Sequence, residues 1–81
     1  LGEEFQGVIS SVLRFGMFIE LPNTIEGLVH ISTFKEHMEF DESSLSLKST
    51  ETSLSFTIGQ VVNVKVVKVN KLLGRIDFVL T

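Results

Sequence analysis

The sequence contains no cysteine, so neither disulfide bonds nor thiolate metal sites can hold its fold together. No apolar run approaches the roughly 20 residues that a bilayer-spanning helix needs. The first residues, Leu1-Gly2-Glu3-Glu4, lack the basic and apolar regions of a signal peptide. These absences favour a soluble domain in a reducing compartment, and we expect it to be cytoplasmic and not associated with a membrane.

The length of the chain limits it to one modest hydrophobic core. Its 81 residues are enough for a single domain and too few for a second one. The sequence begins with Leu1 rather than methionine, and we therefore expect residues 1–81 to be one domain excised from a larger protein.

Positive charge is scarce, since the formal net charge is -3. This argues against indiscriminate binding to nucleic acids, because lysine and arginine supply most of that affinity. The charge is unevenly distributed. Residues 1–42 contain two basic and eight acidic residues, whereas residues 43–81 contain five basic and two acidic residues. A polyanion is expected to approach the second half, or a surface that the two halves share.

Alternation of apolar and polar residues predicts five strands and no long helix. The predicted strands cover residues 7–13, 17–21, 25–31, 61–69 and 75–80. In the fourth of them the alternation slips at Val66-Val67, which predicts a β-bulge and places Val67 and Val69 on the inner face. Five strands of this kind favour an all-β fold, a small closed or nearly closed barrel.

Residues 35–57 form the least regular part of the sequence. Residues 44–48 and 54–56 alternate in the manner of half-buried strands, so we expect an extra hairpin between the third and fourth barrel strands. The many serines and threonines are also compatible with a flexible linker. His30 and His37, with Glu36 and Glu39, do not have the spacing of known metal ligands, and no metal site is expected.

One aromatic residue stands on the polar side of its strand. Met17, Ile19 and Leu21 alternate with Phe18 and Glu20, so the Phe18 ring is expected to point to solvent rather than into the core. Phe15 precedes Gly16 at a bend. From the residues alone, the core and the surface are equally good positions for the Phe15 ring.

Several segments together resemble the S1 RNA-binding domain, an OB-fold barrel of five strands in a Greek-key arrangement. They are Gly7-x-Val, Phe15-Gly16-x-Phe18, Glu26-Gly27-Leu28-Val29-His30-Ile31-Ser32, Ile58-Gly59, Val62-x-Val64-Lys65-Val66 and Arg75-Ile76. The resemblance implies that Phe15, Phe18 and His30 contact RNA, with Lys65 and Arg75 as nearby cationic residues. Bases stack on aromatic rings, and cations beside the rings bind phosphates without reading sequence. For Lys65, a role as an ordinary solvated lysine of an edge strand is equally compatible with its position.

A finer similarity is to the S1 domain of the bacterial ribonuclease R family, 3′ to 5′ exoribonucleases. It rests on Phe40-Asp41-Glu42, Phe56-x-Ile58-Gly59 and Ile76-Asp77-Phe78-Val79-Leu80, although His37 and Met38 stand where that family has aromatic residues. The resemblance implies a monomer that binds single-stranded RNA beside catalytic and cold-shock-type domains. Those enzymes cut RNA with clustered aspartates that hold magnesium. No such motif occurs here, so we expect no catalytic residue and no cofactor in this domain.

Two alternatives remain open at this stage. The domain can belong to another RNA protein, such as polynucleotide phosphorylase or a translation factor. Alternatively, the acidic first half and the replaced aromatic residues can describe a barrel that has lost RNA affinity and packs against a neighbouring domain or partner.

Overall fold

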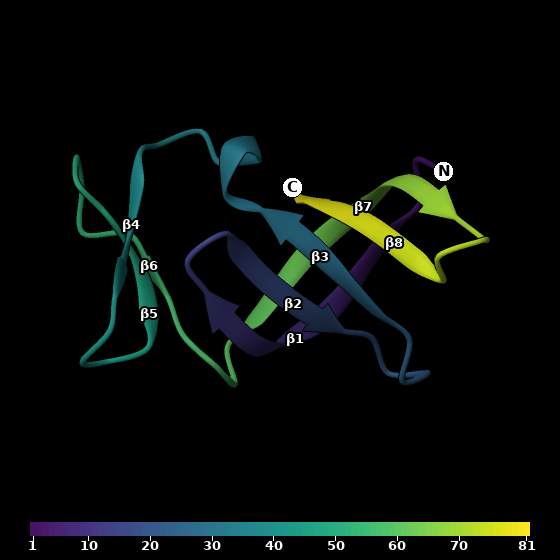
Figure 1. The fold of residues 1–81 in the computed structure, drawn as a ribbon, viewed down its shortest axis with the longest axis horizontal. Coiled ribbons are helices and arrows are strands. Elements are labelled where there is room, and N and C mark those ends of the chain that lie inside the picture. The colour runs from purple at the N-terminus through teal and green to yellow at the C-terminus, as the bar shows by residue number, and fades with distance from the viewer.

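A computed structural model describes all residues, 1–81, as eight strands and one short helical turn (Figure 1). The elements are β1 (Glu4–Leu13), β2 (Gly16–Glu20), β3 (Glu26–His30), the 3₁₀ turn η1 (Ile31–Thr33), β4 (Met38–Asp41), β5 (Ser46–Ser49), β6 (Ser55–Phe56), β7 (Val61–Asn70) and β8 (Arg75–Leu80). All five predicted strands are present, with ends that differ by a few residues. No helix has the length and apolar character needed to cross a membrane.

Five of the strands close into a barrel in the order β1-β2-β3-β8-β7. The β3–β8 pair is parallel, and the other neighbouring pairs in the barrel are antiparallel. Counting only barrel strands, the order is 1-2-3-5-4, the Greek-key arrangement of an OB-fold. The predicted fold class is therefore confirmed.

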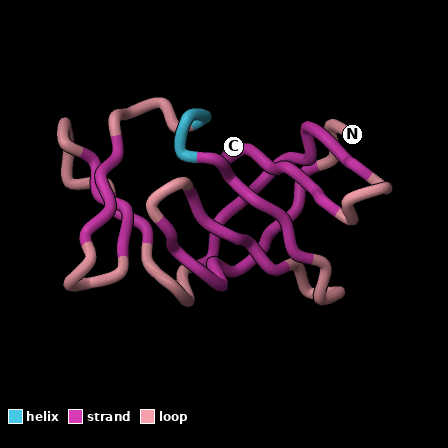
Figure 2. The backbone as a smooth tube through the Cα atoms, viewed as in Figure 1, coloured by secondary structure: helices cyan, strands magenta, loops and turns pink.

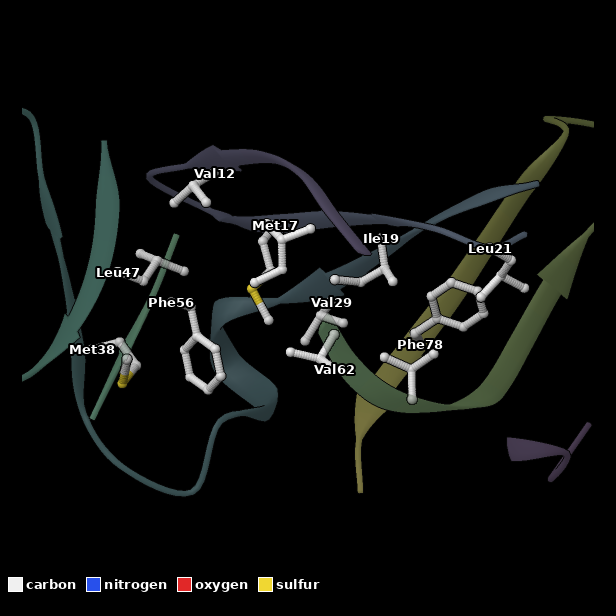
Figure 3. Packing of buried hydrophobic residues seen from close by; sticks show 12 residues of the cluster. Val12, Met17, Ile19, Leu21, Val29, Met38, Leu47, Phe56, Val62 and Phe78 are labelled. Carbon is white, nitrogen blue, oxygen red and sulfur yellow. The ribbon is translucent and has the colours of Figure 1, made fainter. Parts of the chain in front are cut away.

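The period-two pattern of β2 determines which side chains fill the barrel. Met17 and Ile19 are completely buried, and both lie in the cluster shown in Figure 3. Phe18, between them, points to the outer face and is only half-buried. The prediction that Phe18 stands apart from the core is confirmed.

Strand β7 contains the predicted bulge, because its register with β8 shifts between Val66 and Lys68. The expected burial of Val67 and Val69 is wrong, since 46% and 47% of their surfaces are exposed. Beyond the bulge, the β7–β8 hairpin extends toward its turn at the end of the barrel (Figure 1).

The insertion between β3 and β7 is an ordered antiparallel sheet of β4, β5 and β6. Its Met38, Leu47 and Phe56 are buried in the same cluster as Val12 and Met17 of the barrel (Figure 3). The predicted hairpin corresponds to β5 and β6, and shared burial excludes a flexible linker. Strand β4 was not predicted. Figure 2 shows the helical turn where the chain leaves β3 for this sheet.

Candidate nucleic-acid interface

A groove of about 420 Å³ lies on the outer face of the barrel, across β2, β3 and the start of β8. Its lining residues are Phe15, Phe18, Glu26, Gly27, Leu28, His30, Gly74, Arg75 and Ile76. The structure thus brings together four of the five predicted RNA-contacting residues. The fifth, Lys65, does not line the groove.

Two phenylalanine rings form one end and the middle of the groove. Phe18 on β2 lies directly opposite Leu28 on β3. The Phe15 ring, 46% exposed, meets the Phe18 ring edge-to-face, with centroids 6.4 Å apart and planes at 87°. In an edge-to-face pair the edge of one ring covers only one face of the other, so the arrangement still offers stacking surfaces for flat, unsaturated ligands.

The turn that carries Phe15 is held in place from several sides. At Gly16 a Cβ would lie 2.2 Å from the carbonyl oxygen of Val29, so only glycine lets β2 approach β3 this closely. The carbonyl of Phe15 accepts a hydrogen bond from the Ile31 amide at 2.8 Å. These contacts hold the backbone beneath the exposed ring.

Arg14 connects the same turn to the inserted sheet. Its guanidinium lies 5.1 Å from the centroid of the Phe40 ring on β4 and 3.3 Å from the carboxylate of Glu42. Exposed ion pairs of this kind contribute about 0–1 kcal/mol, and the cation–π contact about 0.5–1 kcal/mol. Together they orient the insertion relative to the aromatic end of the groove.

His30 ends β3 beside Phe15 and is oriented by the turn that follows. Its Nδ1 accepts a hydrogen bond from the Ser32 amide at 3.1 Å and lies 2.8 Å from the Ser32 hydroxyl oxygen. A backbone amide can only donate, so the proton of the neutral ring lies on Nε2. Nε2–H is then the donor left to contact a ligand.

The cationic residues divide between the groove and its edge. Arg75 lines the groove and donates to Asp77 at 3.3 Å. Lys68 lines an adjoining depression together with His30 and Arg75. Lys65 pairs with Glu4 of β1 and Val79 of β8, whereas the bulge sets Lys68 opposite Asp77. A contact between Lys65 and RNA stays a prediction, and Lys68 was not among the five residues predicted to contact RNA.

Glu26 and Leu28 also line the groove and were not predicted as site residues. A signal was available, because Glu26, Leu28 and His30 alternate with Gly27 and Val29 along β3 and so share its outer face. The parallel pairing of β3 with β8 then places Glu26 and Arg75, the first residues of their strands, at the same end of the groove.

The perturbed carboxylates lie in and beside the inserted sheet rather than in the groove. The Lys48 ammonium, 2.8 Å from Asp41, and the Ser43 hydroxyl hold the pKa of the Asp41 carboxyl well below its usual range. Hydrogen bonds from Ser49 and Thr52 lower the pKa of Glu36. The groove itself combines aromatic surface with one imidazole, one guanidinium and one carboxylate, a set suited to binding flexible polar ligands.

Comparison with known proteins agrees with this geometry. A protein similar in sequence is ribonuclease R 1 of Lactococcus lactis, 54% identical over 79 residues, which are 96% of this chain and 10% of that protein. Ribonuclease R of Thermotoga maritima is 41% identical over 81 residues, 99% of this chain and 11% of that protein. The chain therefore spans about a tenth of the length of these relatives, as their coverage shows.

A solved structure of Mycoplasma genitalium RNase R, in complex with ribose-methylated single-stranded RNA, superimposes on the whole chain. Its TM-score is 0.93 at 26% identity, and the chain covers 13% of it. The predicted similarity to ribonuclease R is thereby confirmed. The family profile described as "S1 RNA binding domain" matches residues 1–80, and the chain belongs to the S1 RNA-binding domain family.

Proposed function

We propose that this domain binds single-stranded RNA along the β2–β3–β8 groove, as an accessory module of a 3′ to 5′ exoribonuclease of the ribonuclease R type. The observation that carries the proposal is the convergence of Phe15, Phe18, His30 and Arg75 on one groove. Unpaired bases stack on the rings, Arg75 binds phosphate, and His30 donates to a phosphate or a 2′-hydroxyl.

Binding is expected to be weak, salt-sensitive and largely independent of sequence. The net charge of -3 provides no general attraction for a polyanion, so stacking supplies most of the affinity. The role of such a module is to raise the local concentration of RNA near a catalytic domain. The complex of the M. genitalium relative with single-stranded RNA supports this assignment.

The domain is proposed to act without cleaving RNA and without a cofactor of its own. Its carboxylates Asp41 and Asp77 lie on separate strands, β4 and β8. We expect cleavage, and the magnesium it uses, to belong to a separate catalytic domain. Incubating labelled RNA with this chain and Mg²⁺ should therefore leave the RNA intact.

The test of RNA binding is a titration of the ¹⁵N-labelled domain with a 12-nucleotide oligouridylate at low and at moderate salt. Amide shifts are expected to concentrate in residues 15–18, 26–30 and 74–76, and the affinity to fall as salt rises. Shifts that cluster elsewhere, or no shifts at saturating RNA, would favour the alternative, a barrel that packs against a protein partner.

A further inference from the structure

Glu26 is a carboxylate in a groove that is proposed to hold a polyanion. It is exposed at the start of β3, at the end of the groove away from Phe15 and His30. The chain's ion pairs join Arg14 to Glu42, Lys48 to Asp41, and Arg75 to Asp77. Glu26 belongs to none of them, although Arg75 begins the neighbouring strand β8 at the same end of the groove.

The orientation of the Glu26 carboxylate is set by Ser10. The register of β1 with β2 shifts between Ile9 and Ser11, and the Ser10 hydroxyl at this irregularity donates to Glu26 Oε2 at 2.5 Å. A carboxylate accepts about four hydrogen bonds. Oε1 and the second lone pair of Oε2 therefore stay available to a ligand.

Glu26 lies within reach of a base stacked on Phe18. Phe18 is directly opposite Leu28, and Glu26 is two residues from Leu28 on the same strand face. Two residues along a strand span about 6.6 Å. A base that covers the Phe18 ring can therefore present its hydrogen-bonding edge to the carboxylate.

We propose that Glu26 makes this groove select guanine over uracil at the base stacked on Phe18; this rests on the proposed binding of RNA. An ionised carboxylate only accepts hydrogen bonds. The Watson–Crick edge of guanine presents two adjacent donors, N1–H and the N2 amino group, which match the two carboxylate oxygens. Adenine and cytosine present one amino group. Uracil presents one N–H between two carbonyl oxygens, whose lone pairs oppose the carboxylate.

The experiment compares three 12-nucleotide RNAs at one moderate salt concentration: oligouridylate, the same RNA with one central guanine, and the same RNA with inosine at that position. Inosine keeps N1–H and lacks the N2 amino group. We expect the guanine RNA to bind at least about fivefold more tightly than oligouridylate, the low end of what a bidentate base contact supplies. The inosine RNA should bind with intermediate affinity.

Three variants test whether Glu26 causes this difference. Glu26→Gln should reduce the guanine-to-uracil ratio to less than about twofold, because an amide both donates and accepts. Glu26→Asp keeps the charge, shortens the side chain and should also reduce the ratio. Glu20 lies directly opposite Glu26 on β2 and is not one of the residues that line the groove. Glu20→Gln therefore removes the same charge beside Glu26 without changing a lining residue, and it should leave the ratio unchanged.

The outcomes separate this inference from the proposed function. Equal binding of the guanine and uridine RNAs by the unmodified chain overturns the selection by Glu26 and leaves RNA binding intact. A uniform gain in affinity for all three RNAs in Glu26→Gln shows that the carboxylate only repels phosphates, and also overturns it. Failure of all three RNAs to bind overturns both proposals.

Discussion

Replacing Phe18 by alanine tests the groove most directly. The ring is half-buried, meets Phe15 edge-to-face at 6.4 Å and lies opposite Leu28, whose surface is only 5% exposed. Removing it eliminates the stacking surface for one base, worth about 1–3 kcal/mol. The dissociation constant for single-stranded RNA should therefore rise by about 5- to 150-fold.

The same substitution should leave the fold intact. Partial burial of the ring and its contact with Phe15 together contribute about 1–2 kcal/mol to the free energy of unfolding. Small domains have about 5–15 kcal/mol in total. Phe18→Ala should therefore remain folded, with the amide spectrum outside β2 and β3 unchanged, so that a loss of affinity reports the missing ring.

The assay is a fluorescence-anisotropy titration of labelled oligoribonucleotide with matched variants. Phe5→Ala is the control, because Phe5 is a 37% exposed phenylalanine of β1 that does not line the groove. It should bind RNA as the unmodified chain does. A loss below twofold in Phe18→Ala, or an equal loss in Phe5→Ala, would refute the assignment of the groove.

Three further predictions concern charge, packing and pH. Arg75→Ala should weaken binding and reduce the slope of log K against log salt by about 0.7 per lost phosphate contact, and an unchanged slope would refute phosphate binding by Arg75. Lys65→Ala tests the predicted contact of Lys65, which lies outside the groove: a reduced slope would assign phosphate contact to Lys65, and an unchanged slope would exclude it. Gly27→Ala should lower the free energy of unfolding by about 1–3 kcal/mol in urea denaturation, because the added Cβ would lie 2.6 Å from the buried ring of Phe78. An unchanged urea midpoint would contradict this steric account. Lys48→Met should raise the pKa of the Asp41 carboxyl toward its ordinary value of 3.8, as followed by carboxyl NMR. Because the folded-state pKa is lowered, the contribution of this carboxyl to stability is present above pH 3.8 and is lost as the pH falls below it. If Lys48→Met left the pKa of the Asp41 carboxyl unchanged, Lys48 would be excluded as the cause of the lowered pKa.

The strands of the barrel could be predicted because core-facing and outward-facing residues alternate along them. In β2 the buried Met17 and Ile19 alternate with Phe18, and in β8 the core residue Phe78 stands between Ile76 and Leu80, which pack against the core. Each pattern is a property of neighbouring residues. The strands and their inner faces could therefore be derived without knowing how the strands pair.

Strand β4 shows where this reasoning fails. Its residues, Met38-Glu39-Phe40-Asp41, follow the polar stretch 35–37, and the strand has only four residues. Its apolar side chains pack against residues that are distant in sequence. Met38 is part of the hydrophobic core cluster, and the Phe40 ring is covered by the guanidinium of Arg14. So short a segment forms a strand because of these tertiary contacts. The pattern of neighbouring residues in the sequence does not reveal them.

The sequence by itself determined that five alternating strands form a barrel with Phe18 outside its core, because side-chain direction in a strand follows from period two alone. For Phe15, which precedes β2, the sequence left core and surface equally open, and the structure places the ring on the surface. Only the tertiary structure decided which residues share the groove. The parallel closure of β3 on β8 brings Glu26 to Arg75, and the bulge in β7 sets Lys68, not Lys65, at the edge of the groove. Strand order and register are set by barrel closure, a property of the whole chain.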